Sequence, residues 1–242
     1  MVTDAAGTLD ITSRLTEAHR RIAAAGGDLH ALRIVAVTKG FGPAAVQAAL
    51  AAGIVDVGEN YAQELVRKHA ALHALAAGPE PAGPAPAGPA PAPGLSLLRW
   101  HFLGTIQRNK VAALSPVVSC WQSVARFVEG EAVARRRPGA RVLVEVETTG
   151  ASQRSGCAPH DVAALVAALR ALDLDVAGLM TVAPRDPQGA RQAFRTVRGL
   201  ADLLELPERS MGMSDDLELA VAEGSTMVRL GRALFGPRPS AG

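Results

Sequence analysis

The stretch "IVAVTKGFGPAAVQAALAAGIVDVGEN", residues 34–60, contains the repeating unit of the fold. Ile34–Thr38 and Val55–Glu59 are short runs of apolar and β-branched residues, which are typical of buried strands. Pro43–Ala52 lies between them, has helical spacing and begins with a proline, which the first turn of a helix tolerates. A strand, a helix and a strand in succession predict two parallel strands joined by a right-handed crossover.

The same alternation continues along the chain after a first predicted helix at Leu9–Ala25. Eight such units in 242 residues predict an α/β fold, a (β/α)8 barrel that forms a single domain over residues 1–242. An open doubly wound sheet is the alternative, but "KGFGPAA" follows the first strand in place of the dinucleotide fingerprint GxGxxG. The remaining predicted strands are Arg99–Gly104, Val117–Ser123, Arg141–Glu147, Val176–Val182, Arg209–Met213 and Met227–Gly231, and the remaining predicted helices are Ala62–Ala76, Val124–Arg137, Pro159–Leu172, Pro187–Leu204 and Ser214–Ala222.

One segment interrupts this pattern. Residues 78–94, "GPEPAGPAPAGPAPAPG", hold seven of the 16 prolines of the chain. Such a composition predicts an extended surface loop, inserted between a helix and the third strand. A proline-rich ligand for a partner domain is the alternative.

Composition and charge exclude several classes of protein. The net charge is +2 and no basic stripe is interleaved with aromatic residues, so we expect no nucleic-acid partner. No apolar run approaches the roughly 20 residues that span a bilayer, so we expect no membrane partner. Cys120 and Cys157 are far apart, the histidines lack metal-ligand spacing, and the N-terminus does not resemble a signal peptide. These features predict a cytoplasmic protein without disulfides and without a metal site.

Lys39 stands out because the chain uses arginine for almost all of its positive charge. Only three of the 25 basic residues are lysines, namely Lys39, Lys68 and Lys110. A retained lysine suggests a need for a primary amine, which arginine cannot supply. Lys39 also follows the first strand, and barrels carry their active sites at the carboxyl ends of strands. The alternative is an ordinary strand-end lysine that reaches solvent.

The loops after the seventh and eighth strands predict a phosphate site, as in many barrels. Gly231 and Arg232 lie at a strand-to-helix turn, while Ser210 and Gly212 could add a hydroxyl and a close backbone approach. We interpret Ser214 as a helix cap, because acidic residues follow it. A reactive amine opposite a phosphate site fits pyridoxal 5′-phosphate (PLP), which carries an aldehyde and a phosphate on one ring.

Six sequence pieces carry a family resemblance: "AVTK", "GENYAQEL", "WHFLGTIQRNK", "GLMTVAP", "SMGMSDDLELAVAEGSTMVRLG" and "RALFG". In this order they resemble the pyridoxal phosphate homeostasis proteins, the YggS/PROSC group, over most of the chain. The resemblance implies a fold-type III barrel, like the N-terminal domain of alanine racemase, with PLP held by Lys39 as an internal aldimine. It also implies that Asn60 lies near the ring, that Arg229 faces the pyridine nitrogen, and that Ser210, Gly231 and Arg232 hold the phosphate.

The chain departs from that family in two places. Family members often have threonine where this chain has Arg232, so the phosphate contact there is either ionic or through the backbone alone. The segment "ELPERS" before Met211 is shorter than usual, which leaves the length of the seventh strand and the pose of Ser210 open.

The same residues favour a carrier over a catalyst. Arg229 cannot accept a hydrogen bond and stays protonated, so the ring of PLP would be a weak electron sink. Racemases of this fold bring a tyrosine from a second domain, whereas Tyr61, which we interpret as a packing residue, is the one tyrosine of this chain. We therefore expect a non-catalytic, monomeric protein of PLP and amino-acid homeostasis that delivers PLP to apo-enzymes. A small amino-acid racemase is the alternative, and a phosphate-binding sugar isomerase, in which Lys39 is only a charge, is the third hypothesis.

Overall fold

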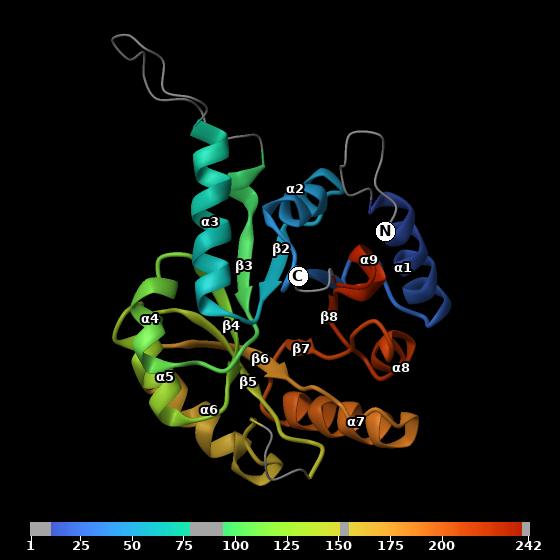
Figure 1. The fold of residues 1–242 in the computed structure, drawn as a ribbon. Helices are drawn as coiled ribbons and strands as arrows, with labels where there is room; N and C mark the ends of the chain where they lie inside the picture. The colour runs from blue at the N-terminus through green and yellow to red at the C-terminus, as the bar shows by residue number, and fades with distance from the viewer. Residues whose placement is uncertain (1–10, 78–93, 151–154, 239–242) are drawn as a thin grey trace.

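The computed structural model of the chain describes residues 11–77, 94–150 and 155–238. Eight strands form a closed barrel in sequence order, and every neighbouring pair is parallel (Figure 1). The predicted (β/α)8 barrel is confirmed. The strands are β1 (Arg33–Val37), β2 (Asp56–Glu59), β3 (Arg99–Phe102), β4 (Val118–Val124), β5 (Arg141–Glu145), β6 (Asp175–Met180), β7 (Glu208–Ser210) and β8 (Met227–Leu230).

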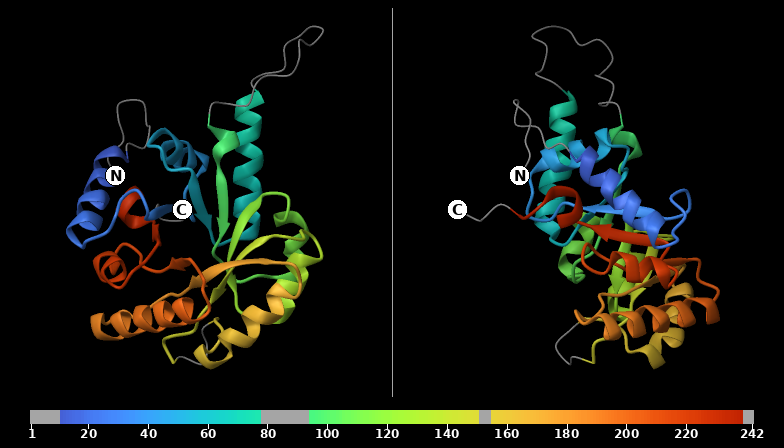
Figure 2. Two further views of the ribbon diagram at one scale, coloured as in Figure 1. Left: turned by 180° about the vertical axis from the view of Figure 1, so that it is seen from behind. Right: turned by 90° about the vertical axis from the view of Figure 1, so that its right-hand side faces the viewer.

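Helices surround the barrel and connect its strands (Figure 2). The N-terminal helix α1 packs beside α8 and α9, where Arg21 pairs with Glu218 at 2.5 Å. The helices are α1 (Thr12–Ala24), α2 (Pro43–Ala51), α3 (Ala62–Ala77), α4 (Arg108–Leu114), α5 (Phe127–Ala134), α6 (Val162–Arg170), α7 (Pro187–Leu203), α8 (Leu217–Ala222) and α9 (Arg232–Phe235), with 3-10 turns at Leu95–Leu97 and Pro159–Asp161. None of these helices is long and apolar enough to cross a membrane, within the part of the chain that the structure describes.

The alternation of side chains along each strand separates an outer core from the barrel interior. Trp121 on β4 is fully buried among the helices and meets the Phe102 ring edge-on, with centroids 5.8 Å apart. Cys120 and Gln122 point to the opposite face of the same strand, into the barrel. Cys120 joins a small apolar cluster there with Leu143 and Met180. The barrel interior is thus apolar in part and, at Gln122, polar.

Several sequence-based boundaries are wrong. β4 continues to Val124, so α5 begins at Phe127 rather than at Val124. Residues 108–114, which are not among the helices given above from the sequence, form α4. β7 ends at Ser210 rather than at Met213. The proline-rich segment lies outside the described residues except for Gly94.

Gly212 explains why β7 is short. Its φ angle is 95°, a left-handed conformation that strands do not use, so the extended path of the strand ends here, although the Gly212 carbonyl still accepts from the Arg229 N–H of β8 at 3.0 Å. A Cβ at this position would lie 2.4 Å from the Cβ of Ala220. The turn therefore requires glycine both for its backbone angle and for the close approach of α8.

Replacing Gly212 tests this constraint. We expect Gly212→Ala to lower the free energy of unfolding by about 2–4 kcal/mol, from left-handed strain and overpacking together. Urea denaturation followed by circular dichroism measures the change. The control is Gly199→Ala in α7, where a Cβ meets nothing within 4 Å and should raise stability by up to about 1 kcal/mol. Equal effects at both positions would contradict the analysis.

Candidate functional site

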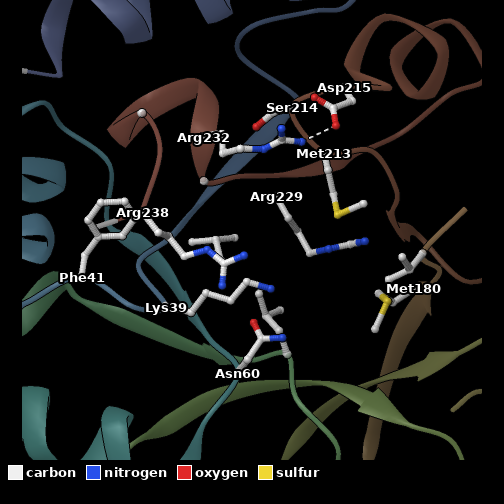
Figure 3. A pocket seen from close by; sticks show the side chains of 15 residues that line it. Lys39, Phe41, Asn60, Met180, Met213, Ser214, Asp215, Arg229, Arg232 and Arg238 are labelled. Atoms are coloured by element: carbon white, nitrogen blue, oxygen red, sulfur yellow. Dashed lines mark hydrogen bonds and ion pairs between the residues drawn. The ribbon is translucent and has the colours of Figure 1, made fainter. Parts of the chain in front are cut away.

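A pocket of about 230 Å³ lies at the carboxyl ends of the strands (Figure 3). Barrels place their functional groups at this end because the βα loops converge there. The polar residues that line it are Lys39, Asn60, Ser214, Asp215, Arg229, Arg232 and Arg238, and the apolar ones are Val37, Phe41, Leu103, Met180, Val182 and Met213, together with Gly231 and Gly236. Of the predicted cofactor residues, Ser210 and Gly212 do not line the pocket.

Lys39 lies two residues beyond the last residue of β1, and its side chain extends into the pocket (Figure 3). Its amine has no hydrogen-bond partner among the residues that the structure describes. Burial lowers the pKa of the Lys39 amine below its usual 10.5, and the positive charges of Arg238 and Arg229 lower it further, while Glu59 opposes them. The pocket therefore favours the neutral, nucleophilic form of this amine.

Arg229 on β8 forms the floor of the pocket, with only 5% of its surface exposed. Its Nη1 donates to the carbonyl oxygen of Ser210 at 2.7 Å and to the Ser210 hydroxyl at 2.8 Å, and its Nη2 donates to the carbonyl oxygen of Thr181 at 2.7 Å. Burial lowers the pKa of Arg229 to about 10, so the guanidinium is still charged at neutral pH. These bonds fix a positive charge below the Lys39 amine.

Ser210 lies beneath this floor rather than in the pocket. It is completely buried, and its hydroxyl donates to Oε1 of Gln122 at 2.7 Å. The amide nitrogen of Gln122 lies 2.6 Å from Nδ1 of His101, whose Nε2 lies 2.8 Å from a carboxylate oxygen of Asp56. We call these four residues and Arg229 the interior polar chain. In it, Ser210 supports Arg229, and His101 is a buried histidine with a hydrogen-bond partner on each ring nitrogen.

Asp56 ends the interior polar chain as a carboxylate. Burial alone would raise the pKa of Asp56, but hydrogen bonds from His101 and Arg99 lower it to about 2. The ionised carboxylate at the base of the barrel and the guanidinium at the pocket are thus connected through buried hydrogen bonds.

Asn60 directly follows β2 and lines the pocket, as predicted for a residue near a bound ring. Its Oδ1 is buried and has no hydrogen-bond partner within the described ranges. A buried acceptor of this kind is costly unless something donates to it. The loop backbone is also tightly packed here, because a Cβ on Gly104 would lie 1.8 Å from the carbonyl oxygen of Asn60.

The rim of the pocket is built by the turn after β8 and by the loop before α8. Gly231 and Arg232 both line the pocket, and the Arg232 guanidinium forms an exposed ion pair with Asp215. Ser214 also lines it, and its hydroxyl accepts a hydrogen bond from the Ala233 backbone at 3.0 Å. The interpretation of Ser214 as the cap of the helix that follows it, α8, is wrong.

A different residue occupies the N-cap position of α8. Asp216 is the N-cap, but its side chain makes no capping bond to the helix; its carboxylate accepts from the Met213 backbone N–H in the preceding loop at 2.5 Å. The turn at Gly212 leaves Ser214 beside α9, with its hydroxyl on Ala233 rather than on α8.

Arg238 is a pocket residue that the sequence did not reveal. It follows α9, lies over Lys39 in Figure 3, and has no ion-pair partner among the described residues. No periodicity or motif marks it, because it belongs to no helix or strand and only the path of the chain after Gly236 brings it to the pocket.

Comparison with known proteins agrees with this geometry. The family model "Alanine racemase, N-terminal domain" matches residues 14–239. A pyridoxal phosphate homeostasis protein of Pseudomonas aeruginosa is 38% identical, over 98% of this chain and 97% of the relative. The chain belongs to the pyridoxal phosphate homeostasis protein family. A relative of the same name from Escherichia coli K12 is 29% identical, over 95% of this chain and 97% of its own length.

Several solved structures are similar to this chain. PipY of Synechococcus elongatus, solved with PLP bound, is 29% identical with a TM-score of 0.75, over 94% of this chain and 100% of PipY. A protein from Bifidobacterium adolescentis is 32% identical with a TM-score of 0.81, over 97% and 98% of the two chains. Alanine racemase from Corynebacterium glutamicum is 20% identical with a TM-score of 0.62 and shares the fold, although this chain covers only 63% of it.

The interior polar chain makes a prediction about stability in this family member. Gln122→Leu removes the acceptor of Ser210 and the partner of His101, so we expect a loss of about 1–3 kcal/mol in the free energy of unfolding for the polar groups left unpaired. Gln192→Leu, on the exposed face of α7, is the matched control and should change stability by less than about 0.5 kcal/mol. Thermal unfolding that gives the two variants equal stability would contradict the role of Gln122.

A second prediction concerns the Lys39 amine. Arg238→Ala removes a positive charge that lowers the pKa of Lys39, so that pKa should rise and the amine should be neutral only at higher pH. Trace labelling with acetic anhydride, quantified at Lys39 by peptide mass spectrometry across a pH series, measures the midpoint. The exposed Arg185→Ala is the control and should leave the midpoint unchanged. A midpoint that stays fixed or falls in Arg238→Ala would contradict the assignment.

Proposed function

We propose that this protein binds PLP covalently through Lys39, without catalytic turnover, and acts in intracellular PLP and amino-acid homeostasis. The observation that carries the proposal is the free amine of Lys39 facing the fixed guanidinium of Arg229 across a partly apolar pocket. The homologues named pyridoxal phosphate homeostasis proteins, and the PLP bound to PipY, support the ligand class.

The residues of the pocket fit PLP in three respects. The Lys39 amine has a lowered pKa, as a nucleophile toward an aldehyde requires. Leu103, Met180 and Val182 offer apolar surface for a flat ring, and the unpartnered Oδ1 of Asn60 offers an acceptor beside it. Gly231 and the cationic rim at Arg232 suit a phosphate group, with Arg232 already partly neutralised by Asp215.

The covalent step uses the neutral form of Lys39. Its Nζ would hold PLP through a C=N bond to the aldehyde carbon, and the carbonyl oxygen would leave as water with both amine protons. Arg229 keeps its protons and can only donate hydrogen bonds, so it would leave a pyridine nitrogen unprotonated. Bound PLP supplies an aldehyde and an electron-withdrawing ring, and this arginine limits the second property.

The distribution of acids and bases favours a carrier over a racemase. Within the described residues, the ionisable side chains that line the pocket are Lys39, Asp215 and three arginines, and Asp215 is paired with Arg232. Tyr61, the one tyrosine in the sequence, is 61% exposed and lines a neighbouring hollow with Lys110 rather than the pocket itself. Among the pocket-lining residues that the structure describes, no second base faces Lys39. We propose a cytoplasmic, monomeric, single-domain protein that delivers PLP to apo-enzymes.

Adding PLP to the purified protein tests the covalent site. We expect a visible absorbance band, and reduction with borohydride should leave the added mass on the peptide that contains Lys39. Lys39→Ala should lose both signals, whereas Lys110→Ala, outside the pocket, should retain them. Absence of the band in the wild-type protein would overturn the proposal and leave the sugar-isomerase hypothesis.

Amino-acid substrates distinguish the carrier hypothesis from the racemase hypothesis. Holo-protein incubated with L-alanine, and separately with D-alanine, should give no sustained formation of the other enantiomer by chiral chromatography. Turnover at typical enzymatic rates, about 1–10³ per second, would overturn the carrier reading.

A further inference from the structure

Lys68 on α3 is a buried cation outside the pocket. Only 4% of its surface is exposed, and its ammonium donates to the carbonyl oxygen of Thr38 at 2.6 Å and to Oε1 of Glu64 at 2.8 Å. A third bond goes to Oε1 of Glu59. All three N–H donors of the ammonium therefore have acceptors. We call Lys68, Glu59 and Glu64 the Lys68 cluster.

The geometry of this cluster requires lysine rather than arginine. Three oxygens, from the end of β1, from β2 and from α3, converge on the single Nζ atom. An ammonium directs three protons from one point, whereas a guanidinium presents a larger planar fork. This explains why Lys68 is a lysine in a chain that has 22 arginines among its 25 basic residues.

The cluster holds the backbone on both sides of Lys39. Thr38, the preceding residue, is held through its carbonyl by Lys68 and through its hydroxyl, which donates to Glu59 at 2.5 Å. Gly40, the following residue, donates its N–H to Oε1 of Glu64 at 2.7 Å. Lys39 itself contacts none of the three cluster side chains through a hydrogen bond, so only its backbone neighbours are fixed.

Lys68 is the one cation of the cluster and faces two carboxyl groups. Glu59 is fully buried, and its second oxygen has no partner among the described residues. Burial raises the pKa of Glu59, while the Lys68 ammonium lowers it. An arginine at position 68 would keep the positive charge and disturb the contacts, which separates the effect of charge from the effect of shape.

We propose that the Lys68 cluster positions Lys39: by fixing Thr38 and Gly40, it sets the direction from which the Lys39 amine enters the pocket. The inference rests on the proposed function, because it concerns capture of an aldehyde by that amine. Lys68, Glu59 and Glu64 are positioning residues and do not touch the ligand.

Two ligands distinguish a positioning role of the Lys68 cluster from a general role in stability. PLP needs the Lys39 amine for covalent capture, whereas 4′-deoxypyridoxine 5′-phosphate has the same ring and phosphate but no aldehyde. We expect Lys68→Arg to slow capture of PLP at Lys39 by tenfold or more, since a displacement of about 1 Å can cost about 10²-fold in a positioned reaction. The dissociation constant of the deoxy analogue, measured by calorimetry, should change by less than about twofold, which corresponds to about 0.4 kcal/mol.

Arg67→Lys on the same helix is the matched control, because Arg67 is exposed and, among the described residues, its side chain hydrogen-bonds only to the carbonyl oxygen of Gln63. It should leave both ligands unaffected. Glu64→Ala is a second variant, chosen because Glu64 is less buried than Glu59, with 18% of its side chain exposed. It should free the Gly40 amide, slow PLP capture and spare the analogue.

Hydrogen exchange gives a readout that needs no ligand. The Gly40 amide should exchange faster in Lys68→Arg and Glu64→Ala than in the wild type. Equal loss of affinity for PLP and for the analogue would overturn the proposal in favour of a structural role, as would unchanged capture or unchanged exchange. Failure of the wild type to capture PLP, with faster exchange in the variants, would instead overturn the proposed function.

Discussion

A guanidinium buried at the mouth of a barrel needs hydrogen-bond acceptors, and the barrel interior is organised around that need. Arg229 obtains them from Thr181 and Ser210, at the ends of two neighbouring strands. An unpaired charge at this depth would cost several kcal/mol. The polar residues of the interior therefore follow from one arginine, and the same arginine supplies the floor on which a ligand bound to Lys39 would lie.

Electrostatics and backbone geometry act together on Lys39. Burial and two arginines lower the pKa of its amine, which favours the neutral, nucleophilic form. The contacts of Thr38 and Gly40 with the Lys68 cluster fix the backbone from which the side chain extends. The two effects come from different parts of the fold. The arginines that lower the pKa lie on β8 and after α9, whereas the contacts that fix the backbone come from the Lys68 cluster, with Lys68 and Glu64 on α3.

The sequence was most informative where function depends on the residue type and its place at a strand end. The rarity of lysine pointed to Lys39, and the alternation of strands and helices predicted the barrel. Motif resemblance indicated Arg229. The two serines around Gly212 were harder to place, because the left-handed turn at Gly212 decides which of Ser210 and Ser214 faces the pocket. A turn angle of this kind depends on close packing against Ala220, which a local pattern does not encode.

Other site residues depend on contacts between distant segments. Gln122 meets Ser210 across the barrel, 88 positions along the chain, and Lys68 meets Thr38 across 30 positions. Neither pairing has a signature in the residues nearby. Arg238 reaches the pocket only because the chain turns back after α9. Local sequence patterns therefore indicate residues that line the pocket better than the contacts that support them.

The interior polar chain has a direction. A guanidinium and an amide nitrogen can only donate, so Ser210 must accept from Arg229, and Nδ1 of His101 must accept from Gln122. The proton of the imidazole then lies on Nε2 and points to Asp56. Along the interior polar chain, every acceptor atom is directed toward Arg229 and every donated proton is directed toward Asp56. Because the hydrogen bonds point the same way, they polarise one another. Ser210, Gln122 and His101 thus form an ordered row of dipoles that stabilises a positive charge at the pocket and a negative charge at the opposite end of the barrel.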